Sequence, residues 1–121
     1  MNIMKSLQVL FLLLSSFMTF SLSAQDISAA TPTEKKLAAI NVEGWQNKLI
    51  LNVKQKEKML ELVTLYEMNK NGIYKSDSDM DTKNKELEAL ETAHHAKVGE
   101  FLSEKQFATF NTLIAATKSG S

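Results

Sequence analysis

The stretch Leu51-Asn52-Val53-Lys54-Gln55 recurs later in the chain as Leu102-Ser103-Glu104-Lys105-Gln106. Both copies place a small polar residue three positions before a glutamine. A side-chain oxygen of Asn or Ser accepts a hydrogen bond from a free N–H of the first helical turn, and the glutamine reaches back to the N–H of the cap residue. The repeat therefore predicts two helix starts, and it assigns a structural role to Leu51, Asn52, Gln55, Leu102, Ser103 and Gln106.

Boundary signals divide the chain into four predicted helices. The first has three start signals in Thr31-Pro32-Thr33-Glu34, and Gly44 favours a stop or a break within it. Asn71-Gly72 is a natural end for the second helix, and the acidic loop that follows favours the positive end of the next helix. The predicted bounds after the first helix are Val53 to about Gly72, about Thr82 to Phe101, and a start just after Ser103.

Apolar residues recur at three- and four-residue spacing along each segment, which is typical of amphipathic helices. The predicted core faces are Leu37, Ile40, Trp45 and Leu49; Gln55, Met59, Leu62, Val63, Tyr66 and Ile73; Leu87, Leu90, His94, Val98 and Phe101; and Phe107, Phe110, Leu113 and Ile114. No alternating strand pattern competes with them. The sequence thus predicts an all-α fold, a small antiparallel bundle of about four helices dominated by a long helical hairpin.

The N-terminal segment has the pattern of an export signal. Lys5 precedes the apolar run Leu7 to Phe20, and a small-residue cleavage site follows at residues 21–24. The run is shorter than the about 20 residues that a membrane-spanning helix needs. We expect residues 1–24 to be a cleaved signal peptide, 25–30 a flexible leader, 31–117 a single helical domain and 118–121 a frayed tail. The expected product is periplasmic or secreted, without stable membrane insertion.

Composition narrows the classes of function. The chain has no cysteine, which excludes disulfides, thiol catalysis and the acylated cysteine of a lipoprotein. Its 14 basic residues are all lysines and are balanced by 14 acidic residues. It therefore lacks the positive charge and the guanidinium groups typical of a nucleic-acid binder. It also has no Gly-rich phosphate loop and no nucleophile elbow. We expect neither an enzyme nor a nucleic-acid-binding protein, and no cofactor.

One acidic cluster has the spacing of calcium ligands. Asp77, Asp79 and Asp81 alternate along the chain, and Glu88 stands where a calcium loop places its bidentate ligand. Thr82, however, occupies the position at which the sharp turn of such a loop needs glycine. A solvated acidic loop before a helix is the simpler interpretation.

The two histidines of the chain suggest a second metal hypothesis. Glu91 lies three and four residues before His94 and His95, an arrangement that recurs in helical-bundle metal sites. Such sites need a second copy on another helix, which a dimer axis would supply. The simpler interpretation is a core histidine at position 94, because this residue lies in the apolar stripe of its helix.

Three apolar residues of the second predicted helix lie off its core stripe: Leu60, Leu65 and Met68. This helix therefore either contacts two neighbours or exposes an apolar patch. An exposed patch marks an interaction site, and methionine suits a surface that accepts many partners. We take these three residues as the candidate surface for binding apolar segments of client proteins.

The paired motifs resemble the LTxxQ signature of the Spy/CpxP-like family of small periplasmic helical proteins, with Asn52 and Ser103 in place of the threonine. The export signal, the absence of cysteine and the lysine-rich hairpin agree with short members of this family from Bacteroidetes. The resemblance covers about residues 45 to 115. It implies an envelope-stress protein that acts as an ATP-independent chaperone, as an inhibitor of a sensor kinase or as a zinc-responsive accessory protein, in some members as a homodimer.

Two functions are therefore expected. The leading one is an exported, chaperone-like or envelope-stress protein that binds exposed apolar segments of unfolded or envelope proteins. The rival is a metal-responsive, zinc-binding accessory or regulatory protein of the envelope that uses Glu91, His94 and His95.

Overall fold

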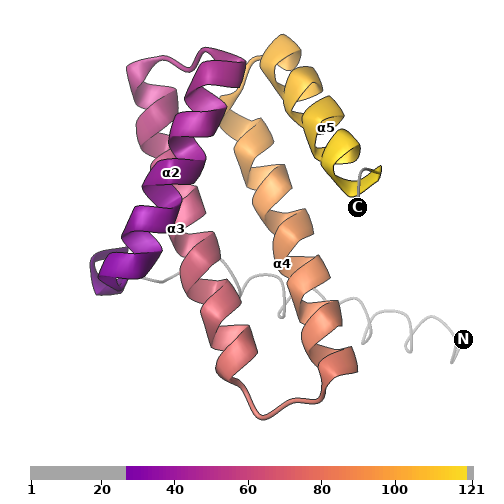
Figure 1. Ribbon diagram of the computed structural model, residues 1–121. Helices are drawn as coiled ribbons and strands as arrows, with labels where there is room; N and C mark the ends of the chain where they lie inside the picture. Colours follow the sequence, from indigo (N-terminus) through magenta and orange to yellow (C-terminus); the bar gives the residue numbers. More distant parts are fainter. Residues whose placement is uncertain (1–26, 120–121) are drawn as a thin grey trace, which may run out of the picture.

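The protein is an α-helical bundle built around one long hairpin. The computed structural model describes residues 27–119, so the predicted signal peptide lies outside the described residues. A short 3-10 helix, η1 (Ile27–Ala29), precedes four α-helices: α2 (Pro32–Leu49), α3 (Val53–Lys75), α4 (Met80–Phe101) and α5 (Glu104–Ser119). α3 and α4 form the antiparallel hairpin, α2 packs on α3, and α5 folds back beside α4 (Figure 1). The predicted all-α bundle is confirmed.

The residues just before α2, within the segment 25–30 expected to be a leader, form a short turn from Ile27 onward. Ile27–Ala29 forms a 3-10 turn, in which the N–H of Ala30 donates to the carbonyl of Ile27 at 3.1 Å. Ala30 is buried, and η1 contacts α3. η1 thus packs against α3 directly before the cap of α2.

Three helices begin with the same pair of hydrogen bonds. In α2, Thr31 and Glu34 exchange cap bonds of 3.1 and 2.8 Å. In α3, Asn52 Oδ1 accepts from the N–H of Gln55 at 2.8 Å, and Gln55 Oε1 accepts from the N–H of Asn52 at 3.0 Å. Ser103 and Gln106 make the equivalent bonds of 3.1 and 2.9 Å. Both capping boxes that the repeat predicts are therefore present.

The glutamines of the two repeats also bind each other. Gln55 Nε2 donates to Gln106 Oε1 at 2.7 Å, and Gln106 Nε2 donates to Gln55 Oε1 at 3.1 Å. Each amide also donates to a carbonyl at the end of a helix, Gln55 to Phe101 at 3.2 Å and Gln106 to Leu49 at 3.3 Å. The last carbonyls of a helix lack partners within it. This reciprocal pair, which we call the glutamine clasp, thus ties the α2–α3 junction to the α4–α5 junction.

Two predicted helix stops lie inside helices. Gly44 is within α2, and Gly72 is within α3, which continues to Lys75. Asn71 does not end its helix, and its side chain donates to Glu34 Oε2 of α2 at 2.7 Å. α2 ends after Leu49, and its cap residue Ile50 has a left-handed φ of 55°.

The buried side of α2 differs from the predicted one. Leu37 and Ile40 are 46% and 59% exposed, so their placement in the core is wrong. Leu49 is buried as predicted, and the other buried residues of α2 are Glu34, Ala38 and Val42. Ala38 is small, which lets α2 approach α3 closely, and the Glu34 carboxylate accepts hydrogen bonds from the Thr31 N–H and the Asn71 side chain. Glu34 can be buried because it has a hydrogen-bond partner on α3 as well as one in its own helix cap.

Three glycines within helices provide a test of this packing. An added Cβ would meet nothing within 4 Å at Gly44 or Gly72, whereas at Gly99 it would lie 2.8 Å from the ring of Phe107. Replacing glycine by alanine inside a helix gains about 1 kcal/mol. We expect Gly44→Ala and Gly72→Ala each to raise the free energy of unfolding by about this amount. The free energy of unfolding of Gly99→Ala is expected to be at least about 1 kcal/mol lower than that of either of these variants, because Phe107 must move.

Urea denaturation followed by circular dichroism measures all three variants. Equal stabilisation by the three alanines would contradict the close approach of Phe107 to α4. A loss of stability in Gly72→Ala would show that α3 does not continue through this residue.

Candidate functional site

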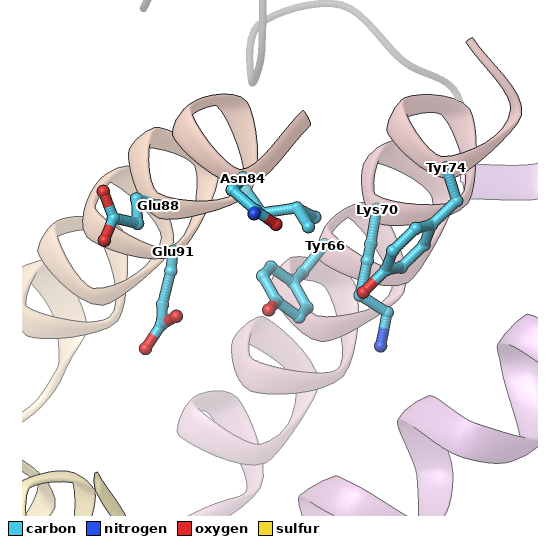
Figure 2. A pocket seen from close by; sticks show the side chains of 7 residues that line it. Tyr66, Lys70, Tyr74, Asn84, Glu88 and Glu91 are labelled. Atoms are coloured by element: carbon cyan, nitrogen blue, oxygen red, sulfur yellow. The ribbon is translucent and has the colours of Figure 1, made fainter. Parts of the chain in front are cut away.

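A groove runs along the α3–α4 hairpin and consists of two adjoining cavities. The larger, of about 450 Å³, lies between α3 and α4 near the loop end of the hairpin (Figure 2). The smaller, of about 210 Å³, is lined by residues of all four α-helices. Tyr66 and Glu91 line both cavities, so we treat them as one site, the hairpin groove. α2 and α5 diverge from the junction end of the bundle (Figure 1), which leaves the loop end of the hairpin less covered.

Aromatic rings line the smaller cavity. Trp45 of α2 packs on Phe110 of α5 with 4.7 Å between ring centroids, and Tyr66 of α3 packs on His94 of α4 at 4.9 Å. His95 meets Phe110 edge-on at 5.3 Å. Such pairs add about 0.5–1.5 kcal/mol beyond the burial of their area. They hold the four helices together and give this end of the groove an aromatic wall.

The charged residues of the groove differ between its two sides. On α3, Lys70 Nζ lies 3.1 Å from Glu67 Oε2 and 5.5 Å from the ring centroid of Tyr66. On α4, Glu91 pairs with Lys118 of α5 at 3.3 Å, while Glu88 is exposed. Burial raises the pKa of the Tyr66 hydroxyl, and the negative charge of Glu91 raises it further. Tyr66 therefore stays neutral and offers a hydroxyl group within a largely aromatic surface.

His94 is a buried imidazole with an incomplete set of hydrogen bonds. It is 9% exposed, and its Nδ1 has no hydrogen-bond partner among the described residues. Burial lowers the pKa of His94 from 6.5 to about 4, assisted by the neighbouring His95. Burial also lowers the pKa of His95, against the opposing effect of Glu91. Both histidines are therefore neutral at pH 7.

The ligands of the predicted zinc site do not converge. His95 Nε2 lies 4.0 Å from Glu91 Oε1, but the ring of His94 stacks on Tyr66. Within residues 27–119, no group of three or more His, Cys, Asp or Glu side chains is placed to hold a metal ion. One chain thus does not assemble a three-ligand site from Glu91, His94 and His95.

The acidic segment that has the spacing of calcium ligands contains a helix start. Asp79 Oδ1 accepts a hydrogen bond from the N–H of Thr82 at 2.7 Å, and α4 begins at Met80 rather than at Thr82. The backbone bond from Thr82 holds the pKa of Asp79 below its usual value. Glu88 lies farther along α4 and lines the larger cavity. The acidic residues therefore serve a helix cap and the groove, not a common metal site.

The predicted apolar patch of α3 is wrong as a set of three residues. Leu60 is 42% exposed, but Leu65 is 8% exposed and Met68 is half-buried. The reason is that α3 contacts η1, α2 and α4, so residues off its main stripe are also covered. Of the two outcomes that the sequence left open, contact with more than one neighbour is the observed one.

Two exposed apolar residues, Leu37 and Ile40, lie on α2. Asn41 and Trp45 of α2 line the smaller cavity. Leu37 lies one helical turn before Asn41 on the same side of α2. Ile40 lies on the other side of α2, away from the buried Ala38 and Val42. Sequence reasoning assigned Leu37 and Ile40 to the core, and their alternation with Ala38 and Val42 was the signal that could have corrected this.

No helix within residues 27–119 is both long and apolar enough to cross a membrane. The resemblance to the Spy/CpxP-like family rests on the two short motifs, and the clasp gives those motifs a common structural role. Comparison of the chain with models of known families, with curated proteins and with solved structures gives no match.

Proposed function

We propose that the protein is an exported, ATP-independent chaperone-like protein of the envelope-stress type, which binds apolar segments of unfolded or envelope proteins. The observation that supports this best is the hairpin groove, with Leu37 exposed on α2 one turn before a residue that lines it. The two cavities of the groove, of about 450 and 210 Å³, share Tyr66 and Glu91. This size accommodates a few side chains of an extended segment.

The groove has the composition of a binding surface. Tyr66, Tyr74 and Trp45 supply large rings, and Tyr74 is 53% exposed. Leu37 extends this surface along α2. Burying an exposed leucine or aromatic side chain against a client contributes about 1.5–3 kcal/mol. A few such contacts give weak, reversible binding, which suits a protein that holds clients without an energy source.

Suppression of aggregation tests the proposal. We expect the mature protein in molar excess to lower the light scattering of a chemically unfolded client. A double variant, Leu37→Ser with Tyr74→Ser, should bind clients about ten-fold more weakly or worse, because two exposed apolar contacts are lost. Both positions are exposed, so the variant should remain folded.

Val53→Ser is the matched control. Val53 is 74% exposed, but it begins α3 at the opposite end of the hairpin from the larger cavity. It should protect the client as well as the natural sequence does. If the natural protein leaves light scattering unchanged, the proposed function is wrong; if Val53→Ser loses as much protection as the double variant, the groove is not the binding surface.

A further inference from the structure

The smaller cavity of the hairpin groove is walled by rings from all four α-helices. They are Trp45 of α2, Tyr66 of α3, His94 and His95 of α4, and Phe110 of α5. Neighbouring rings of this set pack tilted or edge-on, with 4.7 to 5.9 Å between their centroids. Aromatic rings gain attraction from further rings in such arrangements, beyond the burial of their area. The wall therefore suits an aromatic occupant better than an aliphatic one of similar size.

The volume of this cavity matches one aromatic side chain. It is about 210 Å³, and Val63 and Ile114 complete its lining with aliphatic groups. An apolar cavity of about 150 Å³ is large enough to bind benzene. The smaller cavity thus has room for one ring and the methylene group that carries it, but not for two rings.

The lining of the cavity favours an uncharged occupant. Its one carboxylate is Glu91, whose Oε1 lies 3.3 Å from Lys118 Nζ. His94 and His95 are neutral at pH 7, since burial lowers the pKa of each. An ion that entered this space would give up its hydration without meeting an unpaired charge, which is unfavourable.

Two lysines outside the lining contact its rings. Lys48 Nζ lies 5.8 Å from the ring centroid of Trp45, and Lys70 Nζ lies 5.5 Å from that of Tyr66. Both distances are within the about 6 Å range of a cation–π contact. Neither lysine lines the smaller cavity. These two rings therefore already have cationic partners from the protein itself, and a cationic ligand gains no advantage over a neutral ring.

The smaller cavity can be reached from the surface. Asn41, an exposed residue of α2, lies in its lining. Tyr66 and Glu91 line both cavities, so the two spaces adjoin. A segment that lies in the larger cavity can therefore place one side chain in the smaller one.

From this geometry we propose that the smaller cavity takes up one uncharged aromatic side chain of the bound segment, such as phenylalanine, against Trp45, Tyr66 and Phe110. The rest of the segment lies along the larger cavity. Segments whose apolar residues are all aliphatic bind the same groove more weakly. This inference rests on the proposed function, because it specifies which side chain of a client that site recognises.

Three short labelled peptides that differ at one position test it. They share two flanking leucines in an uncharged sequence and carry phenylalanine, cyclohexylalanine or leucine at the central position. Cyclohexylalanine is slightly larger than phenylalanine and leucine is smaller, so a preference for phenylalanine over both reports the aromatic ring and not its size. By fluorescence anisotropy, the phenylalanine peptide should bind the mature protein about three- to ten-fold more tightly than either of the others.

Trp45 reports where the ring binds. It is the only tryptophan of the chain, and it lines the smaller cavity. Binding of the unlabelled phenylalanine peptide should shift the emission of Trp45 to shorter wavelength and protect it from quenching by acrylamide. The reason is that a ring in the cavity excludes water and quencher from the indole.

A ring supplied by the protein itself should block the cavity. Asn41→Phe is expected to weaken binding of the phenylalanine peptide about ten-fold and to abolish its advantage over the leucine peptide. Asn47→Phe is the matched control, because Asn47 is exposed on the same helix and lines neither cavity. It adds the same side chain and should keep both the affinity and the preference. Both positions are exposed, so both variants should remain folded.

The outcomes separate this inference from the proposed function. Equal or tighter binding of the cyclohexylalanine peptide, or a Trp45 emission that does not respond to the bound phenylalanine peptide, overturns the inference while segment binding stands. An unchanged preference in Asn41→Phe, or its loss in Asn47→Phe as well, also overturns it, because the ring then binds elsewhere. Absence of binding by every peptide, together with unchanged aggregation of the client, overturns the proposed function itself.

Discussion

Gln106→Ala is expected to lower the free energy of unfolding by about 2–3 kcal/mol, more than a lost helix cap alone. The Gln106 amide accepts from the N–H of Ser103, exchanges two hydrogen bonds with Gln55 and donates to Leu49 at the end of α2. Each such bond contributes about 1 kcal/mol net, and partners left unsatisfied in a half-buried site add to the loss. Ser103→Ala removes one cap bond and should cost about 1 kcal/mol.

A double-mutant cycle isolates the contact between the two glutamines. Because Gln55 and Gln106 share two hydrogen bonds, removing both should cost about 1 kcal/mol less than the sum of the single losses. Urea unfolding of the four proteins supplies the cycle, and Lys105→Ala, an exposed change in the same helical turn, is the control. Additivity within about 0.5 kcal/mol would mean that the clasp does not form in solution.

Ser103→Ala also tests whether the repeat is structural or functional. If Ser103→Ala abolished client binding while its free energy of unfolding stayed unchanged, the capping interpretation would be wrong. We expect the reverse: a measurable loss of stability, with binding retained wherever the protein is folded.

The helix starts were predictable from the sequence because a capping box is local. Both partners of each box lie within four residues, so Thr31, Asn52 and Ser103 could be placed without knowledge of the fold. The clasp was not predictable, because the two glutamines that form it are 51 residues apart. A repeated motif indicates two similar local structures, but only the packing of the helices brings them together.

The predictions of helix ends and of buried faces were wrong for the same reason. Gly72 has the local signal of a helix end, yet α3 continues, and Asn71 bonds across to Glu34 of α2. Leu37 has the hydropathy of a core residue, but the buried face of α2 carries Ala38 and leaves Leu37 exposed. These choices depend on contacts between helices, which outweigh local propensity. The groove arises from the same packing, so the sequence supplied some of its residues but not their assembly.

Acid is expected to destabilise the protein well before its carboxylates are protonated, and His94 is the cause. Burial, with help from His95, lowers the pKa of His94 from 6.5 to about 4. The unfolded chain therefore binds a proton at this residue between these two pH values, while the folded chain does not. Stability due to the neutral imidazole is fully present above pH 6.5 and is lost as the pH falls towards 4.

The size of this effect follows from the pKa difference. A pKa difference of about 2.5 units lowers the free energy of unfolding by about 3 kcal/mol once the pH is below both pKa values. At pH 5 the loss is about 2 kcal/mol. The buried carboxylate Glu34 has a pKa lowered from 4.5, chiefly by the hydrogen bond from the backbone of Thr31. Its contribution is lost at lower pH, so the interval from pH 7 to pH 5 reports mainly on the histidines.

Titration of the unfolding free energy in variants that lack this imidazole checks the prediction. The groups around His94 are His95 on its own helix, Tyr66 on α3 and the Glu91–Lys118 pair, and all of them remain in the variants. Between pH 7 and pH 5, the free energy of unfolding of His94→Leu should fall by about 2 kcal/mol less than that of the natural protein. His94→Gln, which is polar but does not titrate, should show the same reduced slope even where its stability at pH 7 is lower. An unchanged slope in both variants, or a His94 pKa near 6.5 by NMR, would contradict the burial of a neutral imidazole between α3 and α4.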